Sequence, residues 1–248
     1  RYDLACVVGI EQMKVSAPKV SGDPLAAAAW VGQEWQSARY VWPSAFSDLI
    51  DEYQVAYNLD KRYLYEISRK NYRNAALNPN AQTRNWSVND DCFVDDERLN
   101  PVVEGHIRRL DCGQISDGAV TVMLASEERA AEYAKQHAVS LSSIPYIKGW
   151  GHINAPMKFS DKRKLAQRQE TLLPHVAMLF KQTLSRAGLS DINQISGMEV
   201  HDCFNITEYM ILDHSGLYEP GQAWRGIENG DTQVGGRLPM NASGGLIG

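Results

Sequence analysis

The chain has 248 residues, of which 44% are hydrophobic, so it can bury a sizeable core in one large or two modest domains. Its 25 basic and 30 acidic residues give a net charge of -5, which offers no overall positive field for nucleic acid or an anionic membrane. No apolar run approaches the roughly 20 residues that cross a bilayer, so we expect no membrane span. The 4 cysteines form no CxxC pair and the 6 histidines show no HExxH spacing, which predicts reduced intracellular thiols and no metal site.

The first predicted element is a strand over residues 4–10. Its run Leu-Ala-Cys-Val-Val-Gly-Ile is continuously apolar, which is typical of a central strand covered on both faces. Cys6 is therefore predicted to be buried in the core rather than reactive.

A helical pattern with interruptions follows from residue 24 to about residue 81. Alanines and aromatic residues fill 26–35, apolar residues recur at helical spacing over 46–57, and a helix over 60–71 begins at Asp60 as N-cap. The acidic stretch 86–100 lacks the spacing of a calcium loop, so we interpret it as a linker or interface loop.

A turn at Asp117-Gly118 leads into a predicted strand over 120–125, and Ser126 is placed to cap a helix that runs to about residue 137. Residues 144–152 form the next predicted strand. His152 has no cysteine, serine or carboxylate partner nearby in sequence and is interpreted as structural. A long helix over 171–187 is predicted to end at Gly188.

The stretch 198–207 carries a histidine and a cysteine at a predicted strand-to-helix junction. Ile195, Met198 and Val200 indicate the end of a buried strand, and apolar residues recur at helical spacing from Phe204 onward. Amides at a helix start favour a thiolate, so His201 and Cys203 are candidates for chemistry. A buried cysteine and a hydrogen-bonded histidine that merely close a loop remain the alternative.

The sequence of this stretch also resembles a motif of a known protein family. His201-Asp202-Cys203-Phe204 resembles the signature of thiolases of the sterol-carrier-protein-linked type, and residues 239–248 are similar to the Asn-x-x-Gly-Gly stretch that precedes a Gly-His-Pro motif in that family. Short segments at residues 9–13, 74–79 and 116–119 also resemble segments of that family. The resemblance covers nearly the whole chain but only the middle of a family member. The nucleophilic cysteine and the Gly-His-Pro motif would lie outside it, so we expect part of a larger polypeptide rather than a degenerate relative.

The resemblance implies an α/β fold: a partial thiolase fold with layered αβαβα architecture, mixed sheets and an inserted helical loop domain. It assigns residues 1–15 and 114–150 to the end of the N-terminal half, 16–113 to the loop domain and 151–248 to the start of the C-terminal half. It also implies a homodimer, or a tetramer. The compartment would be the cytoplasm in a bacterium, and the peroxisome or mitochondrion in a eukaryote.

The implied activity is that of a thiolase-like acyltransferase acting on acyl-CoA or 3-ketoacyl-CoA thioesters, by Claisen condensation or thiolytic cleavage, in the parent protein rather than in this fragment alone. By resemblance Cys203 is the acid/base cysteine, His201 contributes to an oxyanion hole, and Asn241 and Asp202 position the loops. Coenzyme A is a substrate, with no permanently bound cofactor. Candidate phosphate ligands are basic residues of the helical region: Lys61, Arg62, Arg69, Lys70, Arg73 and Arg84.

Two alternatives remain open. One is a thiolase-like retro-aldol lyase for steroid side-chain CoA thioesters, which a tyrosine in place of the His-Asp-Cys signature would favour. The other is a non-catalytic lipid or acyl carrier, or a scaffold subunit, which the lack of a nucleophilic cysteine upstream would favour.

Overall fold

The computed structural model describes residues 2–167 and 169–248. The chain divides into two compact units, one built from the segments up to Ser21 and from Ile115 to Lys148, the other from Gly22–Gln114 and Gly149–Gly248. Helices and antiparallel strands occur together, which confirms the α/β class expected from the sequence. No helix within the described ranges has both the length and the apolar character needed to cross a bilayer.

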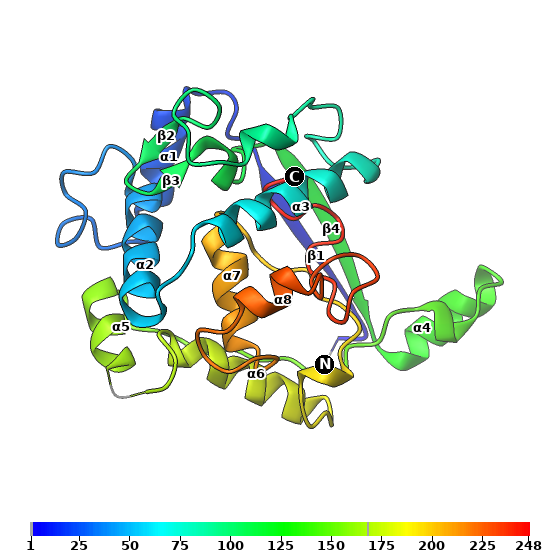
Figure 1. The fold of residues 1–248 in the computed structure, drawn as a ribbon. Coiled ribbons are helices and arrows are strands. Elements are labelled where there is room, and N and C mark those ends of the chain that lie inside the picture. Colours follow the sequence, from blue (N-terminus) through cyan, green and yellow to red (C-terminus); the bar gives the residue numbers. More distant parts are fainter. Residues whose placement is uncertain (1, 168) are drawn as a thin grey trace. The chain divides into compact units, whose positions relative to one another are not determined.

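The first unit is built on a two-stranded antiparallel ribbon of β1 (Leu4–Glu11) and β4 (Gly118–Ala125), drawn as paired arrows in Figure 1. The register pairs Leu4 with Ala125 and Glu11 with Gly118. Next to the ribbon's end, Asp117 Oδ1 accepts hydrogen bonds from the backbone N–H groups of Met13 at 2.7 Å and Lys14 at 2.8 Å. The two strands predicted from the apolar runs are therefore confirmed.

The expected burial of these strands is wrong. Every residue of both strands is exposed, Cys6 included, and Val7 and Val8 keep 53% and 54% of their surface accessible. A ribbon of two strands buries its side chains only when another layer packs on it, because pairing satisfies the backbone but covers neither face. The apolar run therefore predicted the strand correctly but not its environment.

Beyond the ribbon, α4 (Glu127–Gln136) begins at the predicted cap: the Ser126 side chain accepts a hydrogen bond from the Arg129 N–H. A single 3-10 turn, η3 (Leu141–Ser143), follows it.

The second unit is mainly helical. Its principal helices are α2 (Val41–Tyr57), α3 (Arg62–Leu77), α5 (Phe159–Ala166), α6 (Pro174–Arg186), α7 (Asn205–His214) and α8 (Trp224–Glu228). Its remaining elements are the strands β2 (Val102–Glu104) and β3 (Ile107–Arg108), and the 3-10 turns η1 (Asp90–Cys92), η2 (Arg109–Asp111) and η4 (Ile192–Gln194). Helix α1 (Pro18–Ala26) contains the boundary between the two units, which falls after Ser21.

Helix α7 lies at the centre of the core of this unit and packs against α2, α3 and α6. Nine of its ten residues are buried, which is typical of a helix surrounded by other elements rather than one lying on a surface. Tyr53 of α2 meets Tyr209 edge-on, with ring centroids 5.7 Å apart. Next to it, His214 Nε2 accepts the Leu173 N–H at 2.9 Å and therefore ties α7 to the start of α6.

Three of the predicted helices are confirmed with shifted ends: α2, α3 and α6 cover the apolar spacings at 46–57, 60–71 and 171–187. Gly188, predicted to end the last of these, has a φ of 72°. The helical interpretation of 26–35 is wrong, since beyond the end of α1 this stretch folds into turns and Trp35 has a left-handed φ of 58°.

The strand predicted over 144–152 is also wrong, because this stretch is irregular. Its glycines allow a loop to approach α6 closely: a Cβ at Gly149 would lie 2.7 Å from Thr183 O, and one at Gly151 would lie 2.3 Å from Thr183 Oγ1. The glycines of the stretch therefore serve close packing rather than strand pairing, whereas Tyr146, Ile147 and Trp150 are exposed.

Candidate functional site

The stretch 198–204 does not form the predicted strand, since its pairing is limited to two isolated bridges, a parallel one between Met198 and Met240 and an antiparallel one between Cys112 and Phe204. It keeps the alternation of a strand nonetheless. Asp202 and Phe204 are buried, whereas His201 is exposed and Cys203 is half-buried. The exposed His201 therefore marks the outward side of the segment, whereas the Cys203 thiol is only partly accessible, since the chain bends at this residue and its side chain packs against the core.

The entry into α7 is fixed by packing and by one buried amide. Phe204, the N-cap, has an extended backbone, and its ring lies 4.7 Å from that of Phe46. The next residue, Asn205, donates from Nδ2 to Leu64 O at 3.0 Å and to Asp111 Oδ1 at 2.8 Å. These contacts anchor the residues that follow Cys203 to α3 and to η2.

Cys203 is half-buried and makes two polar contacts. Its carbonyl oxygen accepts the Gly113 N–H at 2.8 Å, and its Sγ lies 3.7 Å from Thr207 Oγ1. Burial raises the pKa of the thiol, and the hydrogen bonds from Thr207 and from the Phe204 amide only partly oppose that rise. The expectation that the helix start would favour a thiolate is therefore wrong, because desolvation outweighs the nearby donors.

Asp202 points away from its two neighbours and into the protein. It is fully buried: Oδ2 accepts from Asn71 Nδ2 at 2.9 Å, and Oδ1 accepts from the Leu246 N–H at 2.6 Å. Burial raises the pKa of this carboxyl to about 7, the Leu246 amide works against the rise, and the nearby Glu208 carboxylate adds to it.

Asn241 joins the second resembling segment to the first. It is fully buried with a left-handed φ of 50°, and its Oδ1 accepts the Val200 N–H at 2.7 Å. Its own N–H donates to Met198 O at 2.9 Å. Further along, Ser243 donates through its N–H and hydroxyl to the Glu199 carboxylate at 3.0 and 2.6 Å. The segment 239–246 therefore runs beside 198–203.

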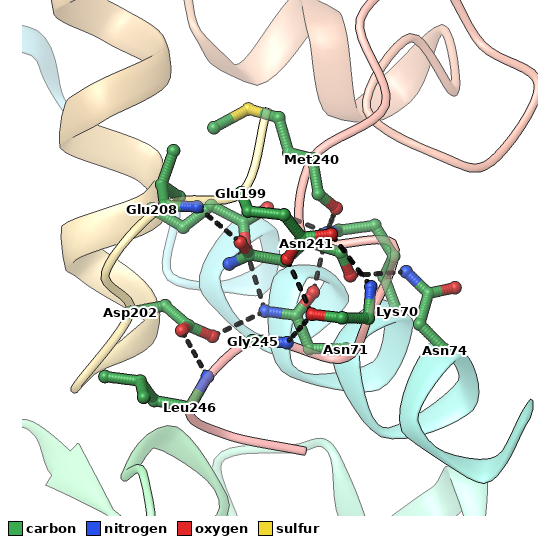
Figure 2. Close-up of polar contacts among 12 residues, drawn as sticks. Lys70, Asn71, Asn74, Glu199, Asp202, Glu208, Met240, Asn241, Gly245 and Leu246 are labelled. Carbon is green, nitrogen blue, oxygen red and sulfur yellow. Dashed lines mark hydrogen bonds and ion pairs between the residues drawn. The ribbon is translucent and has the colours of Figure 1, made fainter. Parts of the chain in front are cut away.

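Two residues at the centre of this site were missed from the sequence, Asn71 of α3 and Glu208 of α7, and a third, Lys70 of α3, was named only as a candidate phosphate ligand. Figure 2 shows them meeting Asp202 and Asn241 in one hydrogen-bonded group. Asn71 stands 131 positions before Asp202 and 137 before Glu208, so no local spacing connects them. The one signal was a carboxylate at 208 inside an otherwise apolar helical pattern, because such a group is rarely buried unless it is paired.

The basic residues considered as phosphate ligands are all engaged within the described structure. Their partners are Asp95 for Lys61, Asp60 for Arg62, Glu66 for Arg69, Glu208 for Lys70, Asp90 for Arg73 and the carbonyl of Pro79 for Arg84. Three of them, Arg69, Lys70 and Arg73, line a hollow of about 170 Å³ between α3 and residues 227–234. These pairings single out none of the six as a coenzyme ligand. In the described ranges no group of three or more His, Cys, Asp or Glu side chains gathers as a metal ion would require.

Comparisons with known proteins find thiolase-like relatives. The family described as thiolase C-terminal domain-like matches residues 158–248. An acetyl-CoA acetyltransferase of Methanothermobacter thermautotrophicus is 28% identical over 247 residues, which cover 99% of this chain and 58% of the relative. Human sterol carrier protein 2 is 27% identical over 212 residues, covering 85% of this chain and 36% of the relative. The chain therefore spans between about a third and three fifths of these relatives.

A solved structure titled Ltp2-ChsH2(DUF35) aldolase superposes with a TM-score of 0.70 at 20% identity, covering 99% of this chain and 60% of that one. That likeness concerns the fold and confirms the thiolase-like architecture expected from the sequence.

Proposed function

Since this chain belongs to the thiolase superfamily, we propose that the protein carrying it is a thiolase-like acyltransferase that acts on acyl-CoA or 3-ketoacyl-CoA thioesters. The observation that carries the proposal is that His201 and Cys203 both keep part of their surface accessible while Asp202, between them, turns inward to hold the segment. The similarity to an acetyl-CoA acetyltransferase over 99% of the chain supports the same chemistry.

In the proposed reaction a carbon–carbon bond next to a thioester carbonyl breaks or forms through a carbanion. In the cleavage direction a nucleophilic thiol outside this chain would add to the 3-keto carbon and keep the acyl group as a thioester, which free coenzyme A then takes over. The electron pair of the broken bond is left on the α-carbon, and a positioned acid must protonate that carbon. Cys203 fits this role, because burial raises the pKa of its thiol and keeps the proton on sulfur at rest. In the condensing direction the same sulfur takes the proton from the α-carbon.

His201 would donate a hydrogen bond to the thioester oxygen on which negative charge develops. Its side chain is exposed, so an imidazole N–H is available to a ligand. Asn241 and Asp202 would act indirectly, since both are fully buried: Asn241 accepts the Val200 N–H, and Asp202 accepts the Leu246 N–H. Coenzyme A would be a substrate rather than a resident group.

A retro-aldol lyase is the second candidate, since a fold neighbour is titled an aldolase. That likeness at 20% identity supports the fold alone, whereas the intact His201-Asp202-Cys203-Phe204 sequence favours acyl transfer. A non-catalytic carrier or scaffold subunit is the third. A homodimer is a further prediction from the resemblance, and light scattering of the purified protein tests it.

The deciding experiment is a coenzyme-A-dependent cleavage assay of a 3-ketoacyl thioester with the full-length protein. We expect Cys203→Ala to lower the rate by about 10² to 10⁴, the range of a positioned acid or base. His201→Ala should lower it by about 10² to 10³. Cys92, also a half-buried free cysteine, provides the matched control, and Cys92→Ala should leave the rate unchanged.

Activity that survives Cys203→Ala unchanged would overturn the proposed role. Cleavage of the corresponding 3-hydroxyacyl thioester, without consuming free coenzyme A, would favour the retro-aldol reaction, and no turnover of either substrate would favour the carrier or scaffold.

A further inference from the structure

Beneath the outward face of His201 lies a closed group of polar side chains from segments far apart in sequence. Lys70 and Asn71 come from α3, Glu208 from α7, and Asn241 from the loop beside them (Figure 2). Asn71, Glu208 and Asn241 keep at most 1% of their surface exposed, and the side chain of Lys70 keeps 9%.

Lys70 is the only cation in the group, and it contacts two of its members and the backbone carbonyl of Met240. Its Nζ lies 2.9 Å from Glu208 Oε1, and it donates to Asn71 Oδ1 and to Met240 O, each at 2.6 Å. Glu208 Oε1 accepts no hydrogen bond from the described residues other than what this ion pair supplies. Without the ammonium, that oxygen would be a buried charge with no partner, which is strongly unfavourable.

Two chains of hydrogen bonds, here called routes, start at Lys70. The first leads to Asp202, the residue after His201. An ammonium only donates, so its contact with Asn71 Oδ1 fixes the orientation of that amide and turns Nδ2 toward the carboxylates. Asn71 Nδ2 then donates to Asp202 Oδ2 at 2.9 Å. On its other oxygen Asp202 accepts the Leu246 N–H at 2.6 Å, so this route ends at the Leu246 amide.

A second route runs from Lys70 to the residue before His201. The ion pair holds the Glu208 carboxylate, whose Oε2 accepts from Asn241 Nδ2 at 2.9 Å. With Nδ2 so engaged, Asn241 presents Oδ1 to the Val200 N–H at 2.7 Å. The two routes therefore reach the chain on both sides of His201.

We propose that Lys70 is a positioning residue for His201: through Asn71 and through Glu208 it fixes both neighbours of the imidazole and so sets where that ring stands on the outward face. Lys70 touches neither His201 nor the outward face. Its effect on a reaction at that face passes through Val200 and Asp202. The inference concerns the same site as the proposed acyl transfer, but the geometry that supports it does not depend on which reaction occurs there.

The test uses amide hydrogen exchange, measured at single residues by NMR in the full-length protein. Lys70→Met removes the charge and keeps most of the apolar stem. We expect the amides of Val200 and Leu246 to exchange at least about tenfold faster, because the acceptor of each is held by one of the two routes. The Gly221 amide, which donates to the buried Asp213 carboxylate at 2.7 Å outside this group, should keep its rate.

Arg73→Met is the matched control variant. Arg73 stands three residues further along α3 and pairs with Asp90 at the surface, where its side chain is 63% exposed. It should leave all three amides unchanged. A Lys70→Met protein whose Val200 and Leu246 amides exchange at the original rate would overturn the proposal. So would equal acceleration of Gly221, since that would show general loosening rather than positioning.

If Lys70→Met fails to fold, Asn71→Ala tests the proposal instead. It interrupts the first route and leaves the ion pair between Lys70 and Glu208 in place. It should speed exchange at Leu246 and spare Gly221, and an unchanged Leu246 would contradict the proposal.

Steady-state kinetics complement the hydrogen-exchange experiments if the unsubstituted protein cleaves a 3-ketoacyl thioester. Lys70→Met should then lower kcat by about tenfold or more with little change in KM, as expected when a group acts on the reaction step rather than on substrate binding. If the unsubstituted protein cleaves no thioester, the proposed function fails, while the exchange comparison still decides the role of Lys70.

Discussion

Replacing Asn241 measures how strongly the loop at 239–246 is tied to the segment that carries His201. The side chain is fully buried, accepting from the Val200 N–H at 2.7 Å and donating to Glu208 Oε2 at 2.9 Å. Asn241→Ala leaves the Val200 amide without its acceptor, which costs about 1 to 3 kcal/mol, and removes a hydrogen bond to a charged carboxylate, worth about 1.5 to 3 kcal/mol. We therefore expect the free energy of unfolding to fall by about 3 to 5 kcal/mol.

A second variant separates the lost hydrogen bonds from the backbone. At Asn241 φ is 50°, a left-handed conformation that glycine adopts freely and alanine does not. Asn241→Gly loses the same two bonds, so it should be about 1 kcal/mol more stable than Asn241→Ala.

Urea titration followed by circular dichroism, with linear extrapolation to water, measures both differences. A loss of less than about 1 kcal/mol for Asn241→Ala would show that the Val200 amide finds another partner and would refute the reasoning. Equal stability of the two variants would refute the part that rests on the backbone.

Three further predictions concern single sites. Burial raises the pKa of Asp202 in the folded protein to about 7 from its ordinary value of 3.8, so the folded protein holds an extra proton between those pH values. The free energy of unfolding therefore falls as pH rises through them, and Asp202→Asn should remove up to about 4 kcal/mol of that fall, measured by urea titrations at pH 4 and 7. Gly245→Ala would place a Cβ 2.4 Å from Asp202 Oδ2 and should cost about 2 to 4 kcal/mol, whereas the control Gly235→Ala, also at positive φ but with open space around it, should cost about 1 kcal/mol by thermal unfolding. Ser126→Ala removes the cap of α4 and should cost about 1 kcal/mol, seen as faster exchange of the Arg129 amide, and an unchanged rate would contradict the capping assignment.

The sequence predicted best those elements whose signal is local. Helices α2, α3 and α6 followed from apolar residues three and four apart, and the caps at Ser126 and Gly188 from residue types that suit those backbone positions. The strand β1 was found from its apolar run, but its burial was not, because an apolar run shows what a strand can pack against and not what is present.

The candidate site was predicted only in part, because only some of its residues are close together in the sequence. His201 and Cys203 stand two apart in one motif, and the inward turn of Asp202 follows from alternation along the segment. Lys70, Asn71 and Glu208 meet only through the tertiary fold, so no spacing in the chain indicates them. The predicted thiolate failed because the burial of Cys203, which raises the pKa of its thiol, cannot be read from the motif.

The assignment of the chain segments to thiolase halves and to a loop domain remains a prediction from the resemblance. The two compact units of the structure describe how the segments pack and do not by themselves say which part of a larger protein each one represents.

The central claim is that the Cys203 thiol exchanges a proton with the α-carbon of a thioester. The most direct measurement incubates the full-length protein with acetyl-CoA in D₂O and follows deuterium entering the acetyl methyl group. The account predicts incorporation by the unsubstituted protein and by Cys92→Ala, and a rate lower by about 10² or more for Cys203→Ala. Equal incorporation by Cys203→Ala and the unsubstituted protein would contradict it.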